Sequence, residues 1–397
     1  MFRTREFLSK IAGSASLLVM SGIFAQALQF LGTLYLVRVY SPDAYGYFTL
    51  VINWASVCAV ACSLQLHTAL HVARSDERAR EIMAAAIYIV PLVALPSAVV
   101  CFYFGQHLLT LAFILGGALA FSNIGRSALA RKSENVTISG LTIGRAAAAI
   151  AAQVSLRSVG GLGLILGLVI AETIAALAFI GFSLRREKPF RKVKIFKVIR
   201  QLRNFTLWGA LQETVSIGVV LLPFLICSII YDTDVVGHYA VAYRILWAPA
   251  VILSFGFGLV FLTELSRSSS RFWEVLDEVH YRELALLAIL ISLSTPWWLP
   301  HVFRVIVGSN WDIAASMSPP VAIAAASFLI SAPFRQLYRV LEKQIIQLSV
   351  DASVIMLLVM TWLMHDAEPV AWVYVVCGIF VMQNMLLIGL TRIFHKA

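Results

Sequence analysis

Twelve hydrophobic runs, each about long enough to cross a membrane, dominate this chain. They cover residues 11–36, 46–70, 82–104, 107–125, 138–156, 159–183, 204–230, 237–263, 284–300, 317–334, 345–364 and 369–392. A spanning helix needs about 20 mostly apolar residues, and runs this long and this closely spaced do not fit a soluble core. Only 13% of the residues are charged, whereas a soluble domain carries about 25%. The pattern predicts an all-α polytopic membrane protein with about 12 transmembrane helices.

The positions of the basic residues predict how these helices are oriented. With the N-terminus inside, 26 of the 31 Lys and Arg residues fall in cytoplasmic segments, and only Arg38, Arg157 and Arg304 fall in outside loops. Cytoplasmic loops of membrane proteins carry such an excess of basic residues. We therefore expect both termini in the cytoplasm. The formal charge of +10 follows from this bias, so we expect a lipid bilayer and no nucleic acid as its partner.

The most basic segment, residues 185–203, divides the chain into two halves with six runs each. We expect an N-terminal lobe at residues 1–184 and a C-terminal lobe at residues 204–397. The segment between them holds nine Lys and Arg residues, and apolar residues recur in it at every third position. This pattern is typical of a short interfacial helix whose basic face lies on anionic headgroups.

The two halves share a short motif at the same point, between the first and second span of each. Asp43-Ala44-Tyr45-Gly46 precedes Tyr47 and Phe48, and Asp234-Val235-Val236-Gly237 precedes His238 and Tyr239, at an offset of 191 residues. An even number of spans in each half gives parallel repeats, which place a substrate pathway between the two lobes. We therefore predict two six-helix lobes around a central cavity.

Two charged residues, Arg145 and Glu172, lie near the middle of consecutive runs. If these runs form a helical hairpin that turns near Ser158, the residue opposite position 145 is about position 171, so the two charges lie at one depth. An Arg at the centre of a spanning helix costs roughly 2.5–3.5 kcal/mol on insertion scales. A counter-charge, a water-filled cavity or an anionic ligand can offset that cost. The pair is therefore either a structural ion pair or part of a cavity wall.

Further polar residues within spans are candidates for contacts with a substrate. Arg244 lies off the centre of the eighth span, where it could bind substrate or reach the outer surface, and Glu213 has no charged residue opposite it in its own hairpin. The other candidates are the polar side chains Gln26, Asn53, Gln212 and Asp351. Amides in spans often form hydrogen bonds between helices, worth about 0.6 kcal/mol each, so a structural role is open for these residues too.

These motifs resemble those of a known family of transporters. The residues that carry the resemblance are Ser41 to Phe48, Val236 to Arg244, and the span end Glu264-Leu265-Ser266-Arg267. The chain is similar to the O-antigen-type oligosaccharide flippases of the multidrug/oligosaccharidyl-lipid/polysaccharide exporter superfamily. Thr263 replaces the Pro that usually precedes Glu in the closing motif, and the two extra spans typical of lipid II flippases are absent from the pattern.

The resemblance implies an exporter of polyprenyl-diphosphate-linked oligosaccharide in the bacterial inner membrane. It implies alternating access between the leaflets, with H⁺ or Na⁺ as a coupling ion and the polysaccharide polymerase and chain-length machinery as partners. Arg145 and Arg244 would bind the diphosphate, because the planar guanidinium fork suits phosphate oxygens. Amides and aromatic side chains along the cavity would bind the sugar hydroxyls.

Two other functions are compatible with twelve spans. A drug-type exporter of the same superfamily is one, although a cation exporter favours acidic groups and this chain carries both signs of charge. A membrane glycosyl polymerase is the other, although its chemistry needs a large outside loop. The longest outside loop, about residues 299–316, holds one Arg and one Asp.

No motif in the sequence predicts an enzyme, a metal site or a cofactor. The sequence has no G-x-x-x-x-G-K-[ST] loop for ATP. Cys58 with Cys62 and His67 with His71 each share a helix face, but neither pair has further ligands nearby at metal-site spacing. We therefore expect a transporter without catalytic residues, metal or cofactor.

Overall fold

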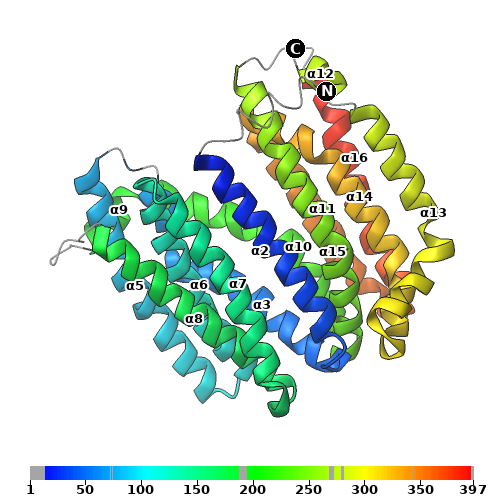
Figure 1. Cartoon of the computed structure of the whole chain (residues 1–397), viewed down its shortest axis with the longest axis horizontal. Helices are drawn as coiled ribbons and strands as arrows, with labels where there is room; N and C mark the ends of the chain where they lie inside the picture. Colours follow the sequence, from blue (N-terminus) through cyan, green and yellow to red (C-terminus); the bar gives the residue numbers. More distant parts are fainter. Residues whose placement is uncertain are drawn as a thin grey trace. The chain divides into compact units, whose positions relative to one another are not determined.

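The computed structural model describes residues 14–394 except 72, 74, 187–194, 268–271, 279–280 and 342. All long elements in these residues are helices and none is a strand (Figure 1), which confirms the predicted all-helical class. In hydrocarbon the backbone amides and carbonyls have no water to bond, and a helix satisfies them within its own segment.

The helices of the first half begin close to the predicted runs. Their bounds are α2 (Ser14–Leu36), α3 (Pro42–Ser63), α4 (Leu66–His71), α5 (Asp76–Tyr103), α6 (His107–Arg131), α7 (Asn135–Ser155), α8 (Gly161–Arg186) and α9 (Ile195–Gln201). Those of the second half are α10 (Ala210–Ile230), α11 (Thr233–Arg267), α12 (Phe272–Glu278), α13 (Tyr281–Val307), α14 (Asp312–Val340), α15 (Gln344–Met360) and α16 (Pro369–Phe394).

Eleven of the described helices are long and apolar enough to cross a membrane. The predicted run at residues 138–156 corresponds to a further long helix, α7, whose hydropathy is lowered by Arg145 and Gln153. The chain is therefore an integral membrane protein, and each predicted run has a helical counterpart in the structure.

Two of the predicted runs have different ends in the structure. The run at 46–70 is divided into α3 and α4, because Leu64 and Gln65 have left-handed backbone angles, with φ of 46° and 57°. The run predicted at 107–125 continues as α6 to Arg131. This extension places Arg126, which the sequence assigns to a cytoplasmic loop, inside a helix.

Local chemistry explains several helix ends. The Ser75 hydroxyl accepts a hydrogen bond from the backbone N–H of Arg78 at the start of α5. The negative charges of Asp76 and Glu77 in the first turn also interact favourably with the helix dipole. Three of the turns between long helices contain Gly105, Gly160 and Gly308 at positive φ, a conformation that a side chain disfavours.

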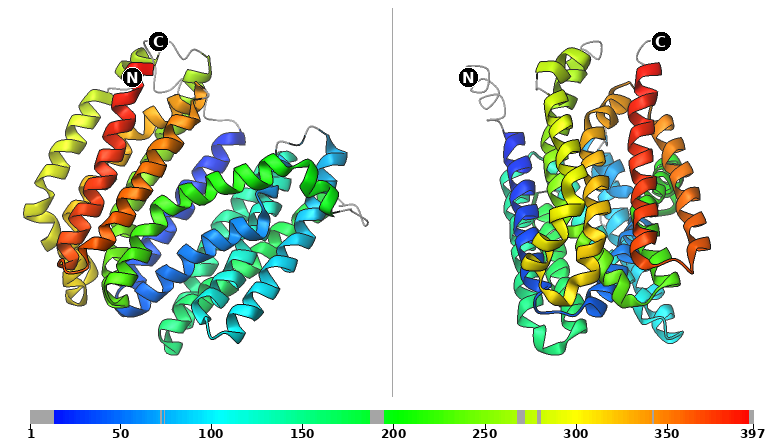
Figure 2. Two further views of the ribbon diagram at one scale, coloured as in Figure 1. Left: turned by 180° about the vertical axis from the view of Figure 1, so that it is seen from behind. Right: turned by 90° about the vertical axis from the view of Figure 1, so that its right-hand side faces the viewer.

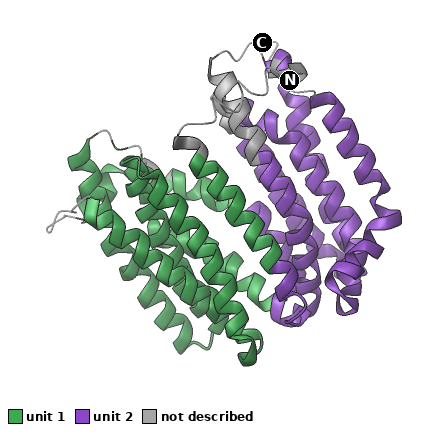
Figure 3. Cartoon of the chain, in the orientation of Figure 1, with its two compact units in different colours: residues 1–32, 47–217 green, residues 33–46, 218–397 purple. Residues whose placement is uncertain are grey.

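The described chain forms two compact units (Figure 3). Unit 1 comprises residues 1–32 and 47–217, and unit 2 comprises residues 33–46 and 218–397. Relative to the predicted lobes, residues 33–46 belong with the second half and residues 204–217 with the first. The predicted interfacial helix at 185–203 is described only in part, since residues 187–194 lie outside the described residues and α9 follows them.

The same helix pairing occurs in both units. In unit 1, α6 contacts α5 and α8, and α7 contacts α8; in unit 2, α14 contacts α13 and α16, and α15 contacts α16. The central helix is therefore α6 in unit 1 and α14 in unit 2, and each is the fourth of the six predicted spans in its half. Figure 2 shows these long helices running side by side within each unit. The pairing extends the short sequence repeat to the tertiary structure.

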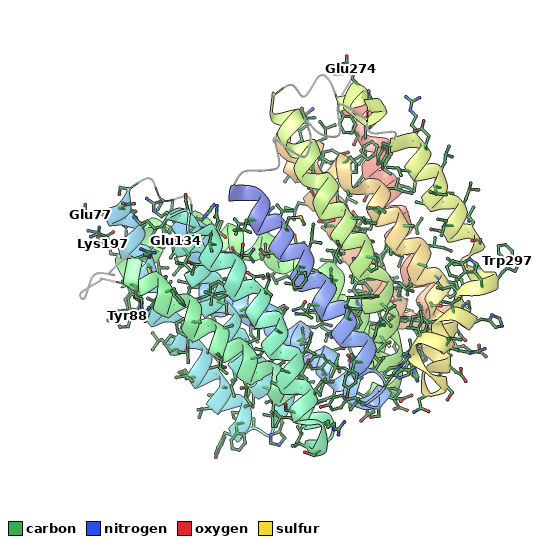
Figure 4. All side chains as sticks on the ribbon, viewed as in Figure 1. Glu77, Tyr88, Glu134, Lys197, Glu274 and Trp297 are labelled. Atoms are coloured by element: carbon green, nitrogen blue, oxygen red, sulfur yellow. The ribbon has the colours of Figure 1, made fainter. Side chains whose placement is uncertain are left out.

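Charged side chains collect at one end of unit 1. Arg131 and Lys132 form ion pairs with Asp76 at 2.9 and 3.0 Å, and Arg186 pairs with Glu134 at 2.9 Å. Figure 4 shows Glu77, Glu134 and Lys197 at this end. In α9, Val198 is buried in the core of unit 1 while Phe196 and Lys197 are exposed. This is the end that the charge distribution assigns to the cytoplasm.

The two copies of the repeated motif pack against each other within unit 2. A Cβ atom added to Gly46 would lie 1.9 Å from the carbonyl oxygen of Thr233, and one added to Gly237 would lie 1.8 Å from the carbonyl oxygen of Pro42. The 191-residue offset relates the two contacts to each other, since Gly46 corresponds to Gly237 and Pro42 to Thr233. The beginnings of α3 and α11 therefore cross with approximate twofold symmetry. The backbones touch here, and only glycine permits this approach.

We predict that Gly46→Ala and Gly237→Ala each destabilise the protein, because the methyl group has no room unless the two helices separate. Overpacking of this kind costs about 1–3 kcal/mol or more. The measurement is thermal unfolding of the purified protein in detergent. Gly140→Ala is the matched control, since a Cβ at Gly140 meets nothing within 4 Å. Equal unfolding temperatures for Gly46→Ala and Gly140→Ala would contradict the close crossing.

Candidate functional site: a buried ion pair and a second arginine

The hairpin of α7 and α8 positions the charged pair. The helices are joined by a short turn at Arg157–Val159 followed by Gly160. Near the turn the Gln153 side-chain amide donates to the Leu164 carbonyl at 3.0 Å. A Cβ added to Gly167 would lie 2.6 Å from the backbone nitrogen of Gln153. This tight contact sets the register that brings position 145 opposite position 172.

Arg145 and Glu172 form the ion pair that this register predicts. One guanidinium nitrogen of Arg145, Nη1, donates to both carboxylate oxygens of Glu172, at 3.0 and 3.2 Å. The Glu172 side chain is 5% exposed and the Arg145 side chain 28% exposed. The contact is therefore confirmed. Because only the carboxylate is fully enclosed, the guanidinium can still contact a ligand.

A second arginine, Arg126, lies on α6, which contacts both helices of the pair, and the sequence reasoning missed it. Its helix, α6, packs closely on α8 beside it, since a Cβ at Gly125 would lie 2.7 Å from the Phe179 backbone. Arg126 is near enough to Arg145 for the two positive charges to repel. It forms no ion pair or hydrogen bond with another residue that the structure describes. The apolar Ala128-Leu129-Ala130 after it was the available signal that the helix continues.

The other predicted residues of unit 1 form no hydrogen bond with the ion pair in the described part of the chain. Gln26, Gln212 and Glu213 are exposed on α2 and α10. Asn53 on α3 is half-buried, and its side-chain nitrogen has no hydrogen-bond partner among the described residues. Within the described part of the chain, no hydrogen bond joins these four residues to Arg145 or Glu172. Of the candidates in unit 1, the structure brings together only Arg145 and Glu172.

In unit 2, Arg244 lies beside the crossing of the two motifs. Its guanidinium carbon is 5.9 Å from the centre of the Tyr45 ring, a cation–π arrangement. The Tyr45 ring meets Trp311 edge-on at 5.8 Å, and Trp311 meets His238 in the same way at 5.4 Å. Arg244 is therefore held by an aromatic cluster, a contact that a residue snorkelling freely to the outer surface would not need.

Asp351 belongs to a buried polar network between α14, α15 and α16. Its carboxylate accepts a hydrogen bond from the Gln383 side-chain amide at 2.7 Å. The neighbouring Asn384 accepts from Arg335 at 2.9 Å and donates to the Ser327 hydroxyl at 2.9 Å. Polar groups bonded in this way link helices in apolar surroundings. The structural role that the sequence left open for such residues fits this network.

The described residues contain no group of three or more His, Cys, Asp and Glu side chains that could hold a metal ion. Cys58 and Cys62 are buried free thiols on α3. His67 on α4 is half-buried.

The fold is shared with known membrane transporters. No protein-family model and no curated protein matches the chain. A solved structure of the lipid II flippase MurJ in an inward closed conformation matches with a TM-score of 0.76 at 14% identity, over 95% of this chain and 87% of that chain. An inward-facing MATE-family multidrug transporter of the MOP superfamily matches with a TM-score of 0.56 at 13% identity, over 97% and 96%.

A third structure, a point mutant of the Vibrio cholerae MATE transporter VcmN, matches with a TM-score of 0.57 at 12% identity, over 96% and 95% of the two chains. At these identities the likeness is one of fold. The chain thus has the fold of MurJ and of MATE transporters.

We predict that Arg145 and Glu172 are energetically coupled. Removing one partner of a buried pair leaves an uncompensated charge, which costs about 3–5 kcal/mol in soluble proteins. Arg145→Gln and Glu172→Gln should therefore each lower the unfolding temperature in detergent, and the double variant should recover most of the loss. A double-mutant cycle measures this coupling. If the loss of stability in the double variant equals the sum of the losses in the two single variants, Arg145 and Glu172 are not energetically coupled.

Proposed function

We propose that the protein is a flippase that moves a polyprenyl-diphosphate-linked oligosaccharide from the cytoplasmic to the outer leaflet, for surface polysaccharide biosynthesis. The observation that carries the proposal is the guanidinium of Arg145, 28% exposed and about 15 Å along α7 from its start at Asn135. A cation at that depth suits an anionic substrate group. The fold shared with a lipid II flippase supports the same substrate class.

The proposed transport step is alternating access, in which the substrate site opens first to the cytoplasmic and then to the outer leaflet. The exposed Gln26, Gln212 and Glu213 and the unsatisfied amide of Asn53 suit sugar hydroxyl groups. Arg244 binds the diphosphate when the substrate site opens outward. An anion that leaves a negative cytoplasm moves down the potential, and each elementary charge that crosses 100 mV contributes about 2.3 kcal/mol.

The cellular setting of the proposal is the bacterial inner membrane, with both termini in the cytoplasm. H⁺ or Na⁺ is the proposed coupling ion, and the polysaccharide polymerase and chain-length machinery are the proposed partners. The excess of Lys and Arg in the predicted cytoplasmic segments supports this orientation.

A drug-type exporter is the second candidate. The fold similarity to MATE multidrug transporters, over nearly the whole of both chains, supports it. The two candidates differ in the charge they must bind, because a flippase for diphosphates needs cationic groups and an exporter of cations needs acidic ones. In unit 1, Arg126 and Arg145 outnumber the carboxylate of Glu172 beside them, which favours the anionic substrate.

We predict that loss of the protein leaves lipid-linked oligosaccharide in the cytoplasmic leaflet while its assembly continues. In proteoliposomes, the purified protein should move a fluorescent polyprenyl-diphosphate-linked sugar between leaflets, measured with a membrane-impermeant quencher. Empty liposomes and the Arg145→Gln variant are the controls. Transport of a cationic dye without transport of the lipid-linked sugar would establish the drug-type exporter instead. Accumulation of single exported repeat units in the deletion strain would point to a polymerase.

We predict that Arg244→Lys reduces flipping of the labelled lipid while the protein level stays near normal. Lysine keeps the positive charge but loses the bidentate fork. Arg244→Ala should reduce flipping further and lower stability slightly, by about 0.5–2 kcal/mol, since the contact with the Tyr45 ring is lost. Flipping and unfolding temperature are measured on the same preparations. Normal flipping by Arg244→Ala would limit this residue to a structural role.

A further inference from the structure

Three charged side chains lie on three helices of unit 1 that contact one another, and their charges do not balance. Arg126 lies on α6, Arg145 on α7 and Glu172 on α8. The Glu172 carboxylate bonds to Arg145. Arg126 lies within electrostatic range of Arg145 and has no acidic partner among the described residues. Two guanidinium groups and one carboxylate leave one positive charge without compensation.

The packing of α6 shows where Arg126 points. On one side of the helix, a Cβ at Gly116 would lie 2.8 Å from the carbonyl oxygen of Ala55 on α3. On the other side, Leu129 packs with Ile138 of α7 and Phe179 of α8. By the helical period of roughly 100° per residue, Arg126 lies on the face between these two contacts. Arg126 therefore lies on the side of α6 between its contact with α3 and its contact with α7 and α8.

The guanidinium groups border space that an additional group can occupy. Arg126 is exposed although it lies five residues inside the end of α6, and the Arg145 side chain is 28% exposed. Gly144, which precedes Arg145 on α7, is exposed, and a Cβ added there would meet nothing within 4 Å. Small residues thus leave room on α7 beside the arginine.

We propose that Arg126 and Arg145 together form a diphosphate-binding site in unit 1, with Glu172 as the carboxylate that holds Arg145 until the anion binds. Each planar guanidinium can donate two parallel hydrogen bonds to one phosphate group, so two arginines suit a diphosphate. The arriving anion balances the surplus charge and competes with Glu172 for Arg145. The identity of the ligand rests on the proposed flippase function, whereas the site rests on the three side chains.

The test measures binding of farnesyl diphosphate to the purified full-length protein in nanodiscs of zwitterionic lipid. Arg126→Gln should weaken binding at least tenfold, and Arg126→Lys should restore part of it. Glu172→Gln should tighten binding several-fold, because the competing carboxylate is gone. These opposite signs separate a binding site from a structural role, in which both variants would weaken binding. Arg200→Gln, at an exposed position of α9, is the matched control for loss of one positive charge.

Folding is monitored separately by thermal unfolding. Arg126→Gln should keep the unfolding temperature of the unaltered protein or raise it, since it removes a repulsion and no ion pair. Wild-type affinity in Arg126→Gln overturns the proposal. Displacement of farnesyl diphosphate by phosphatidylglycerol at equal concentration also overturns it, because Arg126 would then bind anionic lipid headgroups without preference for a diphosphate.

The site and the flippase function can fail independently. If the proteoliposomes flip the lipid-linked sugar but Arg126→Gln leaves diphosphate affinity unchanged, the site is wrong and the function stands. If farnesyl diphosphate binds with the expected dependence on Arg126 and Glu172 but no lipid-linked sugar is flipped, the site stands and the function is wrong.

Discussion

The cost of placing charge in hydrocarbon is the constraint on which the polar architecture of this protein depends. Arg145 is retained within a spanning helix because the buried carboxylate of Glu172 bonds to it at 3.0 and 3.2 Å. In unit 2 the same constraint joins Asp351 to Gln383 across two helices. These two bonds therefore report which helices must lie together. Arg126 forms no ion pair with another described residue, and the proposed anion would supply its missing counter-charge.

Close backbone approach is the second constraint, because lipid supplies no hydrophobic drive to bring helices together. Gly46 and Gly237 let the beginnings of α3 and α11 touch, and Gly125 does the same for α6 and α8. The first contact explains why residues 33–46 belong to unit 2 although they come early in the chain. The repeated Asp-x-x-Gly motif is thus a helix-crossing element, and the aromatic residues around it support Arg244.

The candidate site joins these two constraints. Tight packing of the α7–α8 hairpin at Gly167 sets the register of the ion pair, and tight packing of α6 on α8 at Gly125 brings a second arginine beside it. The proposed anion would bind to this cluster without rearrangement of the backbone, because the arginines lie on packed helices. The fold shared with MurJ and MATE transporters is compatible with several substrates, so the chemistry of these side chains, more than the fold, decides between a lipid-linked anion and a cationic drug.

The sequence by itself determined the helical class, the approximate position of each span and the depth match of Arg145 with Glu172. Hydropathy and hairpin geometry are local properties, and they can be read along the chain. Only the tertiary structure decided where helices end, which chain segments join which unit and what lies beside the ion pair. The extension of α6 past Arg126 had a local signal in Ala128-Leu129-Ala130, whereas the break at Leu64 and Gln65 lies inside an unbroken apolar run. The assignment of residues 33–46 to unit 2 and the packing of α6 on α8 depend on contacts between residues far apart in the sequence, so no local pattern encodes them.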